Sequence, residues 1–123
     1  MKQILVVDDD RELANLVAFG LRLHGYAAQV VANGREALSI LEEHTFDAIL
    51  LDWTMPIMGG EQFLEQHRRR TASAAPVPIL VITAWPDAAH RARQLGAAGV
   101  LAKPFNVNEL MRVLLPLLEP QQR

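Results

Sequence analysis

The chain contains no cysteine, which excludes disulfide bridges, thiol nucleophiles and cysteine-based zinc sites. A large excess of charge is also absent, since the net charge at pH 7 is -2. The chain therefore provides no basic field for nucleic acid. Long hydrophobic runs are missing as well: the first apolar run, residues 4–7, is too short for a signal peptide or a membrane span. We therefore expect a cytoplasmic protein that binds neither nucleic acid nor a membrane.

One basic cluster stands out against this balanced composition, namely His67 followed by Arg68, Arg69 and Arg70. These residues are expected to close a helix, where cations complement the negative end of the helix dipole. A basic contact surface is the less favoured alternative.

The length of 123 residues, with 50% hydrophobic residues, fits one domain with a substantial core. Short apolar runs alternate with longer segments of helical period, a pattern typical of a parallel sheet covered by helices on both faces. The predicted strands are residues 4–7, 27–31, 46–51, 78–82 and 100–102. The predicted helices are residues 11–24, 33–43, 60–70, 85–96 and 106–115, and residues 71–77 form a surface connection.

Capping signals define several of these helix ends. Asp10 is a suitable N-cap for the first helix and Gly25 a suitable stop. The spacing of Asn33 to Glu36, repeated by Asn106 to Glu109, predicts capping boxes for the second and last helices. The last helix is expected to end near Leu115, because Pro116 would clash with a carbonyl one turn earlier. The first helix is expected to bury Leu13, Leu16, Val17 and Leu21.

Carboxylates follow two of the predicted strands. Asp8 and Asp9 come directly after residues 4–7, and Asp52 comes directly after the apolar residues 49–51. Parallel strands place their carboxyl ends at one edge of the sheet, where ligands bind in open α/β folds. Adjacent carboxylates repel one another unless a cation intervenes, and Mg²⁺ prefers such oxygen ligands. Near a metal, Asp52 is positioned as a nucleophile for phosphoryl transfer.

A hydroxyl and a cation are predicted at the same edge. Thr83 follows the strand at 78–82, and Lys103 follows the strand at 100–102. Alone, each would ordinarily be a satisfied or solvated side chain. Pro104, however, favours an extended Lys103, which directs the ammonium toward the acids, where it can hold a phosphate as a point charge. The sequence therefore predicts a phosphoryl site.

The residues at this edge resemble those of a known family, the receiver domains of bacterial two-component response regulators. The resemblance covers essentially the whole chain, and its motifs occur in the family's order and spacing. The matching segments are Val7-Asp8-Asp9, Asp52 with Met55-Pro56, Gly59-Gly60, Thr83-Ala84 and Lys103-Pro104-Phe105.

The resemblance implies a flavodoxin-like, doubly wound α/β sheet of order 2-1-3-4-5 with five helices, in which residues 1–119 form the receiver and 120–123 a tail or linker start. Asp52 would accept a phosphoryl group from a sensor histidine kinase or a phosphotransfer protein. Mg²⁺, with Mn²⁺ able to substitute, would be held by Asp8, Asp9, Asp52 and the backbone carbonyl of Thr54. The phosphoryl group would be bound and signalled by Thr83, Ala84 and Lys103, and the Lys103-Pro104 bond resembles one that is often cis.

Two positions depart from the family pattern. Val100 stands where the family usually has the switch residue Tyr or Phe, so the expected aromatic rotamer change is missing. Trp85 stands where a smaller or polar residue is usual, and its ring either shields the phosphoryl group or packs on the helix surface. The family resemblance implies an output through the fourth helix, the fifth strand and the fifth helix.

Three functional alternatives stay open at this point. The chain is a single-domain phosphorylation switch, a receiver from a larger regulator or hybrid kinase, or a metal-dependent phosphatase with an aspartyl nucleophile. The phosphatase is the weakest, because proteins of that class carry a second catalytic acid two residues after the nucleophile, and this chain has Thr54 there. We expect a phosphoacceptor, not an enzyme. The dimer of winged-helix regulators is disfavoured because residues 97–99 contain no acid.

Overall fold

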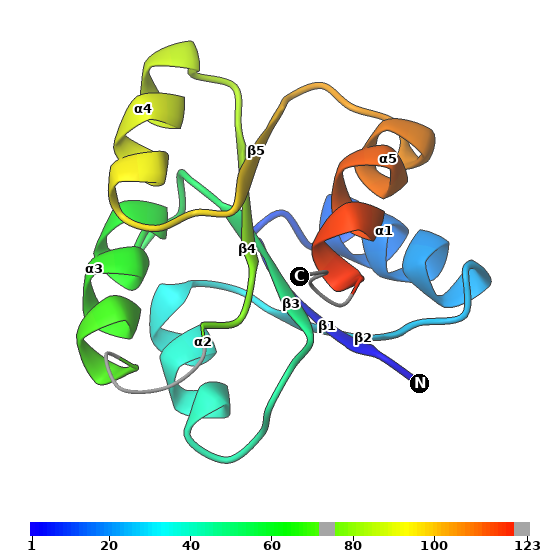
Figure 1. Ribbon diagram of the computed structural model, residues 1–123, viewed down its shortest axis with the longest axis horizontal. Coiled ribbons are helices and arrows are strands. Elements are labelled where there is room, and N and C mark those ends of the chain that lie inside the picture. Colours follow the sequence, from blue (N-terminus) through cyan, green and yellow to red (C-terminus); the bar gives the residue numbers. More distant parts are fainter. Residues whose placement is uncertain (72–75, 120–123) are drawn as a thin grey trace.

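The computed structural model describes residues 1–71 and 76–119, within which strands and helices alternate along the chain (Figure 1). The strands pair in parallel, in the order β2-β1-β3-β4-β5. This confirms the predicted flavodoxin-like sheet. The strands are β1 (Gln3–Val7), β2 (Ala27–Val31), β3 (Ala48–Asp52), β4 (Ile79–Thr83) and β5 (Gly99–Ala102). The helices are α1 (Arg11–Leu23), α2 (Gly34–Leu41), α3 (Gly60–Arg70), α4 (Pro86–Gln94) and α5 (Val107–Leu118).

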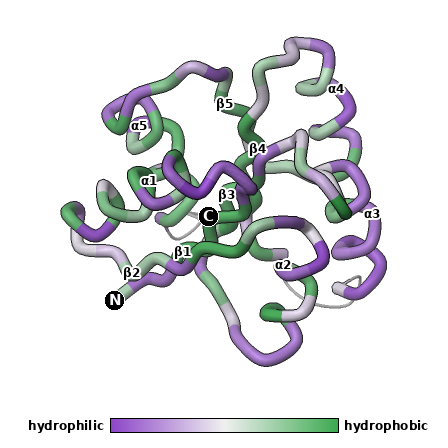
Figure 2. The backbone as a smooth tube through the Cα atoms, turned by 180° about the vertical axis from the view of Figure 1, so that it is seen from behind, coloured by the Kyte–Doolittle hydropathy of each residue, from purple (hydrophilic) through white to green (hydrophobic). Residues whose placement is uncertain are grey.

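Two helical layers enclose the sheet. Figure 1 shows α1 and α5 on one side and α2, α3 and α4 on the other. Alternate residues of each central strand enter opposite cores: Ile4 and Leu50 pack with α1 and α5, whereas Leu5 and Ile49 pack with α2, α3 and α4. Figure 2 shows the apolar residues of β1, β3 and β4 at the centre. Burial on both faces explains why these strands are continuous apolar runs.

The predicted capping signals of α1 and α5 are confirmed. The Asp10 carboxylate accepts a hydrogen bond from the Leu13 amide at 3.2 Å, and Gly25, just beyond α1, has the positive φ of 90° expected of a stop. Asn106 and Glu109 exchange the two hydrogen bonds of a capping box, at 2.8 and 3.1 Å.

The box at α2 differs from the expected one. Asn33 accepts from the Glu36 amide at 3.0 Å as predicted, but Glu36 reaches back to the amide of Ala32, at 2.8 Å, and not to that of Asn33. Helix α2 ends at Leu41, two residues before the predicted end, and β3 begins at Ala48 instead of residue 46. The remaining strand ends agree with the predicted ends to within one residue.

Two predictions about helices are wrong. Leu16 is 59% exposed, because the stripe that faces the core runs through Ala14, Val17, Ala18 and Leu21, and Leu16 lies about 200° around the helix from Ala14. Helix α5 does not end near Leu115 but continues through Pro116 to Leu118. Burial of Leu118 in the core shared with α1 holds this last turn in place despite the proline.

The basic cluster at the end of α3 is smaller than the sequence suggested. His67 is buried and stacks on Phe63, with ring centroids 5.3 Å apart, so only Arg68, Arg69 and Arg70 are exposed there. They lie in the last turn of α3, as predicted.

Among residues 1–71 and 76–119, none of the helices combines the length and hydropathy that a membrane span requires. Most of the predicted surface connection at 71–77 and the predicted tail at 120–123 lie outside the described residues.

Candidate functional site at the carboxyl edge of the sheet

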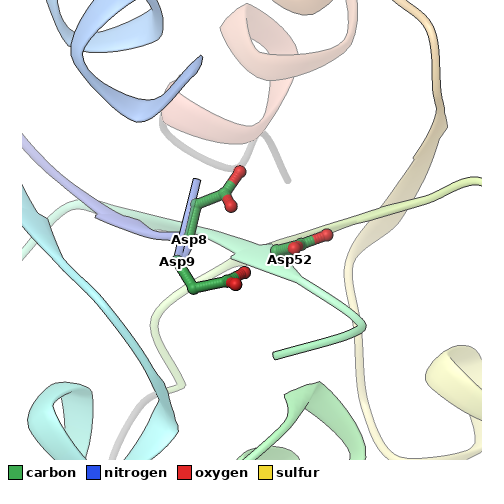
Figure 3. A group of neighbouring side chains, drawn as sticks. All are labelled: Asp8, Asp9 and Asp52. Atoms are coloured by element: carbon green, nitrogen blue, oxygen red, sulfur yellow. The ribbon is translucent and has the colours of Figure 1, made fainter. Parts of the chain in front are cut away.

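Three aspartates meet where β1 and β3 end. Asp8, Asp9 and Asp52 each offer a carboxylate oxygen, and these oxygens lie within 4.8 Å of one another (Figure 3). Asp8 and Asp52 are buried, and Asp9 is exposed. The structure therefore brings together the three acids that the sequence predicted as metal ligands.

Strand register explains this meeting. Val7 of β1 pairs with Leu51 of β3, so the next residues, Asp8 and Asp52, emerge side by side. The Asp8 amide donates to Val31 in β2 at 3.0 Å, and its carboxylate accepts from the Asp10 amide at 2.9 Å. These bonds fix the Asp8 side chain at the start of α1.

Lys103 brings a positive charge to the same point. Its ammonium lies 3.0 Å from the Asp52 carboxylate, and its amide donates to the Thr83 carbonyl at 2.9 Å, continuing the β4–β5 ladder. The Lys103-Pro104 bond is cis, as the family resemblance implied. The lysine thus points toward the acids, as predicted from its position before proline.

Burial controls the protonation of this cluster. It raises the pKa of Asp8 from 3.8 to about 6; repulsion from Asp52 adds to this shift, and the hydrogen bond from the Asp10 amide opposes it. Burial also raises the pKa of Asp52, although the hydrogen bond and charge of Lys103 oppose the shift. Burial alone would lower the pKa of Lys103, but its bond to Asp52 raises it.

The donor set suits a hard divalent cation. Among the described residues, three carboxylates face one ammonium group, so the cluster keeps an excess of negative charge that a cation would neutralise. Carboxylate oxygens at this spacing are ligands that Mg²⁺ accepts, together with water and phosphate oxygens. Thr54 lies exposed in the loop after β3, and a role for its carbonyl as a ligand stays a prediction.

The hydroxyl of Thr83 lies at the same edge. Thr83 is buried at the end of β4, and Ile82 beside it pairs with Asp52. Its hydroxyl oxygen accepts a hydrogen bond from the Trp85 amide at 3.0 Å, so its proton is free to be donated elsewhere. Ala84 follows as an exposed residue.

The two departures from the family pattern occupy different environments. Trp85 is 63% exposed and is the N-cap residue of α4. Val100 lies in β5, half-buried against the core that α2, α3 and α4 cover. Whether the indole shields a phosphoryl group stays a prediction.

Sequence reasoning did not find how the loop after β3 is anchored. Gly60 approaches Asp52 so closely that a Cβ there would lie 2.9 Å from the Asp52 carbonyl oxygen. The Gly34 amide donates to the Met58 carbonyl at 2.9 Å, which ties this loop to the start of α2. In the same loop, Ile57 has a positive φ of 68°. The Gly59-Gly60 pair was a signal for close approach, whereas nothing in the sequence pointed to the contact with Gly34.

Comparison with known proteins decides the family. Residues 4–115 match the family model of the response regulator receiver domain. The chain belongs to this family. It is 38% identical over 111 residues to a response regulator receiver protein of Anaeromyxobacter, an alignment covering 90% of this chain and 46% of that protein. It is 37% identical over 118 residues to the response regulator MprA of Mycolicibacterium vanbaalenii, covering 94% and 50%. The receiver domain thus spans about half the length of these curated relatives.

Solved receivers have the same fold. The chemotaxis response regulator CheY4 of Vibrio cholerae superposes with a TM-score of 0.85 at 33% identity, covering 95% of this chain and 98% of that one. The receiver domain of the sensor histidine kinase PA1611 from Pseudomonas aeruginosa, which has a magnesium ion coordinated in its active site cleft, gives a TM-score of 0.82 at 31% identity, covering 95% and 97%.

Proposed function

We propose that this receiver domain accepts a phosphoryl group on Asp52 from the phosphohistidine of a sensor kinase or phosphotransfer protein. The observation that carries the proposal is the position of Asp52, a buried carboxylate at a strand end with two acids and one lysine around it. The magnesium-bound receiver of PA1611 supports it as a structural relative.

The proposed step is an in-line displacement at phosphorus. An oxygen of Asp52 attacks, the bond between phosphorus and the donor imidazole nitrogen breaks, and that nitrogen keeps the electron pair and takes up a proton. Lys103, already 3.0 Å from Asp52, would pair with the phosphoryl oxygens. The Thr83 hydroxyl would donate its proton to the same group.

Asp8, Asp9 and Asp52 are the residues that would hold Mg²⁺, and the Thr54 carbonyl would complete the protein ligands. Bound there, Mg²⁺ would neutralise charge on the transferred phosphoryl group. Mn²⁺ would substitute because it accepts the same oxygen ligands. The domain would serve as a phosphoacceptor that promotes its own phosphorylation and slow dephosphorylation, not as a turnover enzyme.

The proposed output is a change in contacts with a partner protein or an attached domain through α4, β5 and α5. A free single-domain switch and a receiver within a larger regulator both fit this role.

Intact mass spectrometry after incubation with acetyl phosphate and Mg²⁺ tests the proposal. The wild type should gain one phosphoryl group, Asp52→Asn should gain none, and EDTA should prevent the gain. Asp87→Asn, which changes an exposed aspartate in the first turn of α4, is the matched control and should be labelled like the wild type. Full labelling of Asp52→Asn would refute the assignment.

A further inference from the structure

A cavity of about 670 Å³ opens at the amino edge of the sheet, opposite the phosphoryl site. We call it the amino-edge cavity. It lies between the ends of α2 and α3, residues 44–47 before β3 and residues 76–78 before β4, and its volume falls within the range of small-molecule sites. Its apolar lining includes Leu38, Leu41, Phe46 and Val77.

His67 is the buried polar residue in this lining. Its side chain is only 9% exposed and stacks on Phe63 at an interplanar angle of 8°. The Thr71 hydroxyl donates to the backbone carbonyl of His67 at 2.9 Å, and among the described residues no hydrogen bond reaches the imidazole nitrogens. Burial lowers the pKa of His67, and the charge of Arg70 lowers it further, so the ring is neutral at pH 7 and offers one donor and one acceptor.

The charged groups around the cavity already have partners. Arg70 lies 3.4 Å from the Glu42 carboxylate, and the Asp47 carboxylate accepts a hydrogen bond from the Gln3 amide at 2.7 Å. An anionic ligand would meet two carboxylates and would have to displace Glu42 from Arg70. A ligand without charge avoids both costs.

We propose that the amino-edge cavity binds an uncharged, largely apolar small molecule whose single hydrogen-bonding group pairs with the imidazole of His67. The apolar walls would hold the body of the ligand. His67 would select for a phenol, amide or aromatic amine over a plain hydrocarbon. This site is separate from Asp52, so the proposal does not depend on the phosphoacceptor assignment.

Fluorescence titration with N-phenyl-1-naphthylamine, a neutral aromatic amine that brightens in apolar surroundings, tests the proposal. The matched probe is 8-anilino-1-naphthalenesulfonate, which has the same skeleton and an added negative charge. The neutral probe should saturate one site, and the anionic probe should bind at least about tenfold more weakly because its charge must be desolvated near Glu42 and Asp47. Equal binding of the two probes would overturn the choice of an uncharged ligand.

Matched variants locate the site. Leu41→Trp should fill the cavity and abolish binding of the neutral probe, whereas Leu115→Trp, the same change on α5, should not. Thr45→Trp, at an exposed residue of the lining, provides a second filling variant if Leu41→Trp fails to fold. His67→Leu should weaken binding about fivefold through the lost hydrogen bond, and His90→Leu, at an exposed histidine of α4, should not.

Amide chemical shifts measured with the neutral probe supply an independent readout. Shifts confined to the ends of α2 and α3 and the start of β3 would support the site. The exposed apolar residues Leu16, Phe19 and Leu23 of α1 form the rival location. Shifts centred on α1, probe affinity that survives both filling variants, unchanged affinity in His67→Leu, or absence of binding would each overturn the proposal.

Discussion

Replacing Asp8 by asparagine should stabilise the metal-free protein at neutral pH and have little effect below pH 4. Burial raises the pKa of Asp8 from 3.8 to about 6, so the folded state resists ionisation of this carboxyl more than the unfolded state does. Below the pKa of Asp8 in the unfolded chain, the carboxyl is neutral in both states and burying it does not lower the free energy of unfolding. The free energy of unfolding of the wild type therefore falls as the pH rises toward the pKa of Asp8 in the folded state, over the window from about 4 to 6.

The size of this effect follows from the pKa shift. The difference between the Asp8 pKa values of 3.8 and about 6 corresponds to roughly 3 kcal/mol in the free energy of unfolding. Because water reaches the open side of the site, we expect roughly 1 to 2 kcal/mol. Asparagine keeps the shape of the side chain and the oxygen that accepts from the Asp10 amide. It also removes the repulsion of Asp52.

Urea denaturation in EDTA at several pH values from 4 to 7.5 measures this difference. The stability of Asp8→Asn relative to the wild type should grow between pH 4 and 6 and then level off. Asp9→Asn, at the exposed acid, should show a smaller gain. Added Mg²⁺ should reverse the order, because it stabilises the wild type by mass action and the variant has lost a ligand. Parallel stability curves for the wild type and Asp8→Asn in EDTA would refute the reasoning.

Two further predictions concern the loops around Asp52. Trp85→Ala should accelerate loss of the phosphoryl group, on the order of tenfold if the indole raises the barrier to water attack by about 1.4 kcal/mol. The decay of the phosphorylated mass measures this rate. An unchanged rate would exclude shielding. Gly60→Ala should lower the free energy of unfolding in urea by roughly 1 to 3 kcal/mol, because its Cβ would lie 2.9 Å from the Asp52 carbonyl oxygen. Gly99→Ala, whose Cβ would meet Leu80 only at 3.4 Å, should cost less, and equal losses would contradict the steric explanation.

The fold and the acid cluster could be predicted because their signals are local. Strands buried on both faces are continuous apolar runs, and polar capping residues such as Asp10 and Asn106 determine helix starts through hydrogen bonds a few residues away. Once the strands are parallel and in order, topology alone brings Asp8 and Asp52 to one edge.

The errors arose where tertiary packing decides the outcome. Helix α1 carries apolar residues on most of its circumference, so periodicity could not tell that Leu16 faces solvent while Leu21 is buried. Pro116 is a strong local stop, but burial of Leu118 outweighs it. His67 belongs to a basic run in the sequence, yet the rotation of α3 places it on the core face against Phe63.

Because Val100 replaces the usual aromatic, we expect a change at Asp52 to reach α4 by another route. A valine has no ring to rotate, so we propose that the coupling uses the backbone. Thr83 provides that connection, since its hydroxyl oxygen holds the amide of Trp85, the N-cap residue of α4. Arg91 in turn binds α4 to Glu61 of α3 at 2.8 Å. A rotation of Thr83 toward a phosphoryl group would therefore strain the first turn of a helix whose middle is held by α3, and we expect the loop between β4 and α4 to move before the helix does.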